Sequence, residues 1–342
     1  MSIPIIDLSA INERGTPARQ DLAKQVESAC QTYGFFQITG HKIPQSLLDE
    51  ALEQSRSFFS LPLDVKEKYD KNLGGFNRGY ERLRAQNFEK RTAGDLKEGY
   101  YFGKHLPETH PKVLAKKFNL GPNKYPGAVS DPAKFRDVID RYHDAMLGLA
   151  EQLVRLICET LVIDDSWVPE FVDTPIAVLR LLHYPPQEPH ASEWERGIGA
   201  HTDFGAVTIL LQDLVGGLQV WDRVKCQWTD VTPQRGALVV NLGNLMMRWT
   251  NDRYVSNLHR VINKSGKERY SIPFFFSGNP DFVVRCFENY QASTKDAKYP
   301  PITVGEWVSG RYADTYGTSK EKAVGELSST EATAAGTQTY AA

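Results

Sequence analysis

Three polar side chains in the second half of the chain have types and spacing suited to metal chemistry. His201 and Asp203 are two residues apart, and His259 follows much later. Alternate residues of a strand project from one face, so an imidazole and a carboxylate at this spacing can bind neighbouring positions of one ion. A third ligand from a distant strand would complete a facial set. Two histidines and one carboxylate with open positions are typical of non-haem Fe(II) oxygenases, and a catalytic zinc site is the alternative.

A cation and a hydroxyl follow the third of these residues. Arg269 begins an apolar run, and Ser271 shares its face if that run is a strand. A guanidinium can hold a carboxylate through two parallel hydrogen bonds, and a serine adds another donor. Fe(II) chemistry with O₂ needs two further electrons, which a 2-oxo acid supplies by chelating the iron and losing CO₂. Alone, a His-x-Asp pair is more often a chance occurrence and a single arginine a surface ion pair. Their order along the chain predicts iron beside a carboxylate site.

The segment that must position these residues has the sequence pattern of a β-sandwich, jelly roll or barrel. From residue 176 onward, short apolar runs alternate with turn signals such as Pro185-Pro186 and Gly216-Gly217. The predicted strands are Ile176–Tyr184, Val207–Leu211, Leu218–Trp221, Gln227–Val231, Ala237–Leu242, Met246–Trp249, Leu258–Ile262 and Tyr270–Phe276.

The first half of the chain mixes helices and strands. Strands are predicted at Ile3–Leu8, Phe35–Ile38 and Leu96–Phe102, and helices at Ala18–Tyr33, from a cap at Ser46 to Phe58, and at Phe135–Val162. The last of these is the longest, and its single apolar face predicts a support helix packed behind a sheet. The expected class is mainly β with flanking helices, an α+β fold. We expect an N-terminal region at 1–110, a connection with the support helix at 111–173, the β core at 174–310 and a partly disordered tail at 311–342.

The composition of the chain limits the classes of function and the partners that we expect. The 342 residues carry a net charge of −2, which predicts no attraction to nucleic acid or to an anionic membrane. The chain has no long apolar run and no secretory signal, which predicts a protein that does not enter a membrane. The four cysteines are scattered and form no Cys-x-x-Cys pair, which suits a reducing cytoplasm. The expected partner is a small molecule, and oligomeric state is left open.

Several motifs together resemble those of the isopenicillin N synthase-like family of Fe(II)/2-oxoglutarate-dependent dioxygenases. The resemblance covers the chain from Ile3 to about Trp307. Its Arg-Leu-Leu-His-Tyr-Pro motif is most similar to that of thymine hydroxylase-like and fungal members. The motifs are Pro4-Ile5-Ile6-Asp7, Gly34-Phe35-Phe36, Gly40-His41-Lys42-Ile43-Pro44, Leu179-Arg180-Leu181-Leu182-His183-Tyr184-Pro185, His201-Thr202-Asp203, Asn257-Leu258-His259-Arg260-Val261 and Arg269-Tyr270-Ser271.

The resemblance implies a fold and a reaction. The fold would be a distorted double-stranded β-helix, with Fe(II) on His201, Asp203 and His259. The 2-oxoglutarate would bind Arg269 and Ser271, with Tyr184 as a further contact. The reaction would use O₂ and convert 2-oxoglutarate to succinate and CO₂. A small organic substrate, expected to belong to secondary metabolism, would be hydroxylated, desaturated or rearranged.

Other residues are candidates for lining the substrate pocket. A glycine-rich loop at Gly74–Tyr80 could form its rim, and aromatic residues lie near the expected edges of the site. The candidates are Arg78, Tyr80, Phe102, Arg180, Phe204 and Phe274. Two rival functions stay open, namely an iron oxidase that needs no 2-oxoglutarate and an inactive β-barrel binding protein.

Overall fold

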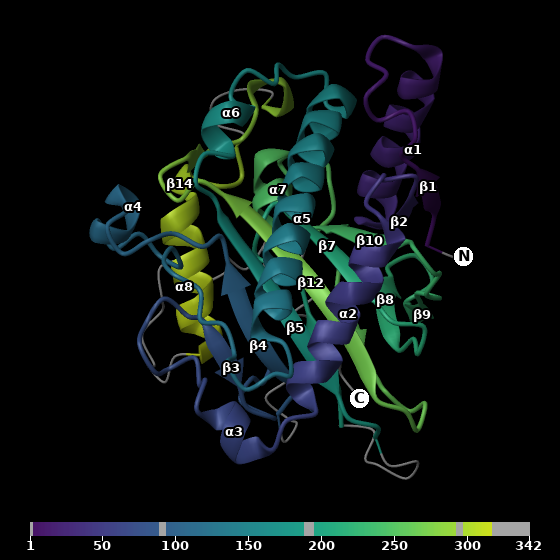
Figure 1. The fold of residues 1–342 in the computed structure, drawn as a ribbon. Coiled ribbons are helices and arrows are strands. Elements are labelled where there is room, and N and C mark those ends of the chain that lie inside the picture. Colours follow the sequence, from purple (N-terminus) through teal and green to yellow (C-terminus); the bar gives the residue numbers. More distant parts are fainter. Residues whose placement is uncertain (1–2, 89–93, 188–194, 292–296, 317–342) are drawn as a thin grey trace.

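Two β-sheets facing each other form the centre of the protein, and helices cover the outer face of the larger sheet (Figure 1). The computed structural model describes residues 3–88, 94–187, 195–291 and 297–316. Among these residues, no helix combines the length and apolar character needed to cross a membrane. The mainly β class with flanking helices is confirmed.

The larger sheet has eight strands in the order β1-β2-β10-β7-β12-β5-β4-β3. Neighbours are antiparallel except β1 and β2. The strands are β1 (Ile5–Asp7), β2 (Phe35–Thr39), β3 (Gly79–Glu81), β4 (Glu98–Gly103), β5 (Ile176–Tyr184), β7 (Val207–Gln212), β10 (Leu238–Leu242) and β12 (Arg269–Gly278). Strands from the first hundred or so residues therefore form both edges of a sheet whose centre comes from the second half of the chain.

The smaller sheet has four strands in the order β6-β11-β8-β9. These are β6 (Ile198–His201), β8 (Leu218–Asp222), β9 (Gln227–Asp230) and β11 (His259–Val261). A separate pair, β13 (Val283–Val284) and β14 (Ile302–Thr303), lies outside both sheets. The two facing sheets form a double-stranded β-helix, as the sequence resemblance implied.

A long helix supports the larger sheet. In α5 (Pro132–Thr160) the apolar residues recur at helical spacing, and Val138, Tyr142, Met146 and Leu153 are buried. The Asp131 side chain caps its start by accepting a hydrogen bond from the Lys134 amide. The helix lies across the larger sheet with α1 and α2 beside it (Figure 1), which confirms the predicted support helix. The other helices are α1 (Pro17–Thr32), α2 (Gln45–Phe59), α3 (Leu63–Glu67), α4 (Pro111–Leu114), α6 (Val168–Phe171), α7 (Asn244–Trp249), α8 (Val304–Tyr316) and the short 3₁₀ helix η1 (Glu288–Tyr290).

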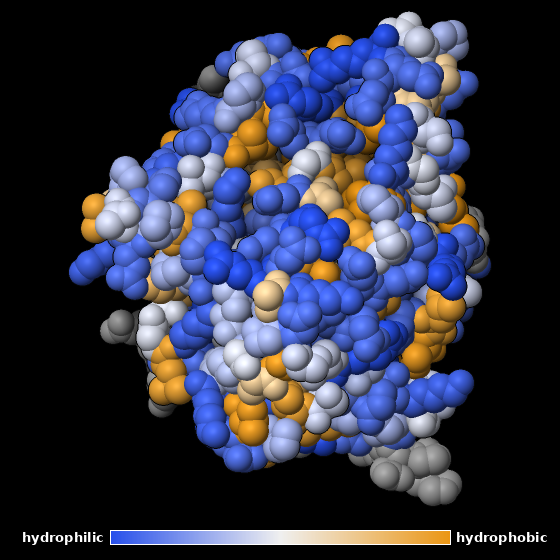
Figure 2. Space-filling model, viewed as in Figure 1, coloured by the Kyte–Doolittle hydropathy of each residue, from blue (hydrophilic) through white to orange (hydrophobic). Residues whose placement is uncertain are grey.

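Apolar residues gather in two cores. The helix side of the molecule is mostly hydrophilic, with apolar residues in separate patches (Figure 2). The main core lies between the helices and the larger sheet. The second core lies between the two sheets and includes Phe35, Leu182, Tyr184, Ile198 and Val261. Because this second core borders the candidate site, it holds that site away from bulk water.

Two local predictions about helices are wrong. Met246–Trp249, predicted as a strand, belongs to α7, and all six residues of α7 are buried. A short segment that is buried on all sides shows neither the two-residue period of a strand nor the 3.6-residue period of a helix. Periodicity therefore cannot distinguish a strand from a helix there. Helix α2 starts at Gln45, after Pro44, and has no side-chain cap, so Ser46 lies inside the first turn rather than capping it.

The predicted tail, 311–342, begins inside a helix. Helix α8 continues through Tyr316, so the residues from Arg311 to Tyr316 are helical. Their position is held by packing that local composition does not reveal, since the ring of Tyr312 meets that of Phe118 with centroids 5.3 Å apart. The remainder of the predicted tail, 317–342, lies outside the described residues.

Candidate active site

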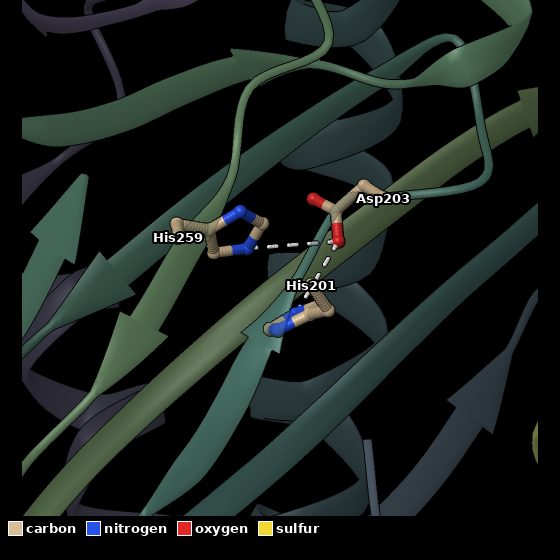
Figure 3. A group of neighbouring side chains, drawn as sticks. All are labelled: His201, Asp203 and His259. Carbon is tan, nitrogen blue, oxygen red and sulfur yellow. Dashed lines mark ion pairs between the residues drawn. The ribbon is translucent and has the colours of Figure 1, made fainter. Parts of the chain in front are cut away.

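Three possible metal ligands converge between the two sheets (Figure 3). His201 ends β6 and His259 begins β11, and the two are register partners in the antiparallel pair. Asp203 lies in the loop just after β6. Its Oδ1 atom is 3.9 Å from His201 Nε2 and 3.8 Å from His259 Nε2. The structure brings together the three residues that the sequence predicts, but Asp203 reaches the site from a loop rather than from the same strand as His201.

Hydrogen bonds aim each donor atom at the common centre. His201 Nδ1 lies 2.8 Å from the Gly199 carbonyl, and His259 Nδ1 lies 3.3 Å from the Asn257 carbonyl. A carbonyl only accepts, so Nδ1 carries the proton in each ring and Nε2 keeps its lone pair. Such partners orient metal-binding histidines and increase their basicity.

The carboxylate of Asp203 is oriented in the same way. Its Oδ2 atom accepts hydrogen bonds from Thr208 Oγ1 at 2.6 Å and from Asn241 Nδ2 at 2.7 Å. These bonds leave Oδ1 facing the two imidazoles. Aromatic rings fix the histidines from behind, because Phe88 stacks on His201 with centroids 4.4 Å apart and Phe35 meets His259 edge-on at 5.1 Å.

The protonation states suit a divalent cation. Burial and the nearby His259 lower the pKa of His201 to about 3, so its imidazole is neutral at neutral pH. Burial opposes ionisation of Asp203, but the two histidines and the hydrogen bonds from Asn241 and Thr208 outweigh it and hold its pKa below the ordinary value. Metal binding requires neutral imidazoles and an ionised carboxylate. The residues present therefore fit an Fe(II) ion.

Substituting Thr208 tests the orientation of Asp203. Thr208→Val keeps the shape of the side chain but removes the donor to Oδ2. We expect Fe(II) affinity to fall about 10- to 100-fold, the usual effect of losing a partner of a metal ligand. Anaerobic Fe(II) titration measures it. Thr229→Val, on β9 away from the cavity, is the matched control, and equal affinities in the two variants would contradict this role for Thr208.

A cavity of about 1030 Å³, including its open mouth, surrounds the possible metal site. Alternate residues of β5 and β12 line it on the larger sheet, and residues of β6, β8 and β11 line it on the smaller one. Helix α8 closes one side with Val308 and Tyr312, and Phe204, whose ring centroid is 6.4 Å from that of Tyr312, also lines the cavity. The walls are mostly apolar, which suits a small organic molecule.

One end of the cavity holds a buried arginine. The Arg269 guanidinium donates from Nε to the Gly216 carbonyl at 2.6 Å, from Nη2 to Gln212 Oε1 at 3.2 Å and from Nη1 to Ser271 Oγ at 3.4 Å. It also lies over the ring of Tyr184, 4.7 Å from the centroid, because Arg269 and Tyr184 are register partners on β12 and β5.

Arg269 has no anion beside it among the residues that the structure describes, although a buried cation usually needs one. The residue is 0% exposed, and no carboxylate in the described parts of the chain forms an ion pair with it. Leaving a charge buried and unpaired is costly. A carboxylate ligand that enters the cavity would remove that cost, and the guanidinium can hold it through two hydrogen bonds.

Two of the six candidate pocket residues, Arg180 and Phe204, line this cavity. Phe274 and Phe102 do not, and the predictions for them are corrected. On β12, Arg269 and its alternate neighbours face the cavity, so Phe274 faces α5, where it meets His143 at 5.2 Å. Phe102 likewise faces the helix side and packs near Phe135.

Arg78 and Tyr80 are also placed elsewhere. Arg78 is 1% exposed and donates to Asn119 Oδ1 and to the Asn119 carbonyl, each at 2.7 Å, and to Asn123 Oδ1 at 3.0 Å. Tyr80 faces the helix side and donates to Glu98 Oε2 at 2.5 Å. The predicted rim residues therefore brace loops and the sheet edge and have no place in the cavity wall.

Removal of Arg78 should affect stability. Arg78→Ala leaves the Asn119 carbonyl and amide oxygen without their buried donors, and we expect a loss of about 3 kcal/mol in the free energy of unfolding. Chemical denaturation measures it. Arg82→Ala is the control, because Arg82 is 58% exposed in its ion pairs and should cost under about 1 kcal/mol. Equal stability of the two variants would contradict the bracing role.

The sequence reasoning missed five residues that shape the site. Thr208, Asn241 and Gln212 are polar residues in otherwise apolar strands, and that signal could have identified them. Gln86 and Phe88 line the cavity from a connecting segment in which no local pattern marks them.

The family models and the similar proteins that match this chain belong to one family. The sequence pattern described as non-haem dioxygenase in morphine synthesis N-terminal matches residues 3–128, and that of the 2OG-Fe(II) oxygenase superfamily matches residues 175–278. The 2-oxoglutarate-Fe(II) type oxidoreductase hxnY of Emericella nidulans is 49% identical over 92% of this chain and 90% of its own length. Clavatol oxidase claD of Penicillium crustosum is 34% identical over 92% of this chain and 96% of its own length.

Solved structures agree with these matches. A full-length Neurospora crassa protein, solved in complex with alpha-KG, superposes with a TM-score of 0.81 at 29% identity, covering 91% of this chain and 96% of that one. A second structure of the same Neurospora crassa protein, which contains alpha-KG and thymine, gives a TM-score of 0.80.

Fold, cavity and relatives together define an Fe(II)- and 2-oxoglutarate-dependent dioxygenase. The chain belongs to the 2OG-Fe(II) oxygenase superfamily. Its reaction uses Fe(II), 2-oxoglutarate and O₂, as the sequence resemblance implied. This class is supported over the 2-oxoglutarate-independent oxidase and over the inactive binding protein.

Proposed function

We propose that His201, Asp203 and His259 bind Fe(II) through Nε2, Oδ1 and Nε2, and that Arg269 holds the distal carboxylate of 2-oxoglutarate. Ser271 and Tyr184 complete the co-substrate site. The observation that carries this proposal is the convergence of three oriented donor atoms, all within 4.8 Å of one another, in the same cavity as a buried arginine that no described carboxylate pairs with.

Each part of the cavity then has a task. Bound iron supplies the centre at which 2-oxoglutarate and O₂ react to give succinate and CO₂, while a C–H bond of the substrate is oxidised. Arg269 orients the co-substrate, because a fork that binds both carboxylate oxygens allows few other poses. The apolar walls exclude water, which strengthens the polar contacts inside.

The primary substrate is proposed to be a small organic molecule. A mostly apolar cavity with a few polar groups suits such a compound. Fungal relatives include clavatol oxidase, and a neighbouring structure contains thymine. On that basis we place the reaction, a hydroxylation, desaturation or rearrangement, in secondary metabolism. All four cysteines are free, which suits work in the reducing cytoplasm, and fractionation of cells that express the protein tests that location.

Two measurements test the proposal. Anaerobic addition of Fe(II) and then 2-oxoglutarate should give the weak visible absorption of an iron–2-oxoglutarate chelate. Candidate small molecules are then screened for stimulated succinate release, and products are identified by mass. Absence of the absorption in folded protein would reject the ligand assignment. A product formed without succinate would instead favour the oxidase that needs no 2-oxoglutarate.

A further inference from the structure

One buried amide in the cavity wall has no hydrogen-bond partner for its donor end. Gln86 lies on the segment that precedes β4, is 4% exposed and lines the cavity. Its Oε1 atom accepts hydrogen bonds, but none of the described residues accepts one from its Nε2 atom. A buried donor without a partner costs free energy, and a ligand that accepts from it would remove that cost.

The orientation of the Gln86 amide is fixed by the groups behind it. Lys97 Nζ lies 2.7 Å from Oε1. An ammonium group can only donate, so the amide atom that faces it must be the oxygen and not the nitrogen. Arg180 Nη1 also donates to Oε1, at 3.5 Å. Nε2, which carries the two hydrogens, is therefore the end of the amide that is turned away from Lys97.

This donor end faces the cavity. Lys97 is 2% exposed and does not line the cavity, so Oε1 is directed into the wall. Nε2 is not among the fully enclosed polar atoms that lack a partner, so it keeps an open side. Because Gln86 is otherwise buried and lines the cavity, that open side is the cavity.

The segment that carries Gln86 is tied to the metal end of the cavity. The Gln86 carbonyl accepts from the Asp95 amide at 2.8 Å, and Asp95 Oδ1 accepts from the Gly199 amide at 2.9 Å. The Gly199 carbonyl in turn orients His201. Two residues after Gln86, the ring of Phe88 stacks on the His201 imidazole. A group bound at Gln86 would therefore lie on the His201 side of the cavity.

Gln86 lies away from the arginine that we assign to the co-substrate. Its neighbour Arg180 is four residues from Tyr184 on β5, and Tyr184 is the register partner of Arg269. Four residues of strand span about 13 Å. The group that meets Gln86 is therefore a different one from the carboxylate proposed for Arg269, and we assign it to the primary substrate.

The walls around this amide are mainly aromatic and apolar. Phe88, Phe204 and Tyr312 line this part of the cavity together with Ile176 and Val178. Such walls hold the carbon skeleton of a ring compound, and a few polar groups fix its orientation. A site built to hydrogen-bond a substrate group rejects an analogue that lacks this group far more strongly than an apolar wall rejects a missing methylene.

We propose that the primary substrate carries a carbonyl oxygen that accepts a hydrogen bond from Gln86 Nε2. This bond orients the substrate against the aromatic walls on the His201 side of the cavity. A substrate that presents an N–H or O–H donor at the same point meets the amide hydrogens and is rejected. The inference rests on the proposed function, since it concerns the substrate of the same cavity.

The test compares two bicyclic probes of similar size and opposite hydrogen-bonding character. 1-Indanone has a carbonyl oxygen and no donor, whereas indole has an N–H donor and no strong acceptor. Each is titrated into enzyme loaded with 2-oxoglutarate and with Zn(II), a diamagnetic ion that binds the same kinds of ligand, and binding is followed by ligand-observed NMR. We expect native enzyme to bind 1-indanone, and absence of binding would overturn the inference.

Two variants change the donor at position 86, and the ratio of the two dissociation constants is compared with that of native enzyme. Gln86→Glu keeps the shape and the contact with Lys97 but replaces the donor by an acceptor. The ratio should shift by at least about tenfold toward indole, because 1-indanone loses a hydrogen bond and indole gains a charged acceptor. Gln86→Met only removes the donor, so 1-indanone should bind about fivefold more weakly and indole as before.

A matched control adds the same charge elsewhere. Gln20→Glu lies on an exposed part of α1 and should leave the ratio within about twofold of the native value. Because both probes are measured on the same preparation, partial loss of folding in a variant changes both signals and leaves the ratio unchanged. A native ratio in Gln86→Glu would overturn the inference.

The two proposals fail in different ways. If the iron–2-oxoglutarate absorption does not form in native enzyme, the proposed function fails. If it forms and the ratio does not respond to Gln86→Glu, only the inference about the substrate fails. Weakened 2-oxoglutarate binding in Gln86→Met would assign Gln86 to the co-substrate and would also overturn the inference.

Discussion

His259→Ala is expected to lower the affinity for Fe(II) by about 250-fold and to reduce succinate formation below detection. Losing one of three ligands removes about a third of a metal-binding free energy that is on the order of 10 kcal/mol, and each 1.4 kcal/mol is a factor of about ten. The variant also leaves Asp203 with a single imidazole neighbour. Anaerobic Fe(II) titration and succinate quantification measure the two effects.

A control distinguishes loss of the metal from loss of the fold. His105→Ala removes an exposed histidine outside the cavity and should leave both measurements unchanged. Because His259 lies in the small sheet and meets Phe35 edge-on, circular dichroism and thermal unfolding of both variants are needed. If folded His259→Ala bound Fe(II) like the native enzyme, the assignment of the metal site would be wrong.

Arg269→Gln is expected to raise the KM for 2-oxoglutarate by about 100-fold with a smaller change in kcat at saturation. Truncating one partner of a buried, hydrogen-bonded charge pair costs about 2–5 kcal/mol, and 1.4 kcal/mol corresponds to a factor of about ten. Glutamine can still donate one hydrogen bond, but it has neither the positive charge of the guanidinium nor its two parallel donors. Steady-state kinetics with varied 2-oxoglutarate separates KM from kcat.

Ser271→Ala is the matched comparison for this prediction. It removes a single neutral donor from the same end of the cavity, so KM should rise only about threefold to tenfold. Iron affinity should be unchanged in both variants, because neither residue contacts a metal ligand. Similar KM values for Arg269→Gln and the native enzyme would exclude Arg269 as the co-substrate anchor.

Local pattern predicted much of the fold because its central strands are short, apolar and separated by turns. Strand β5 has the predicted bounds, Ile176–Tyr184, and the support helix begins and ends within a few residues of its prediction. The three proposed metal ligands could be singled out because their types, spacing and order are rarely combined by chance. The spacing of the two residues did not reveal that the strand ends at His201, so that Asp203 approaches the site from a loop.

The wrong assignments have separate physical causes. The alternation that places Arg269 and Ser271 in the cavity also turns Phe274 away from it, so that residue could have been excluded from the sequence. Arg78 could not, because its partner Asn119 lies far along the chain. The ion pair between Arg180 and Glu81 was equally hidden, since only the sheet pairing brings the two residues together.

The hydrogen bonds that aim His201, His259 and Asp203 have a practical consequence for the isolated enzyme. Their donor atoms are in place before any ion arrives, so the site resembles an open chelator made of nitrogen and oxygen. Such a set binds cobalt, nickel and zinc more tightly than ferrous iron. Selection among ions must then come from cellular supply, and protein purified over a nickel resin should need stripping and anaerobic reloading before its turnover is measured.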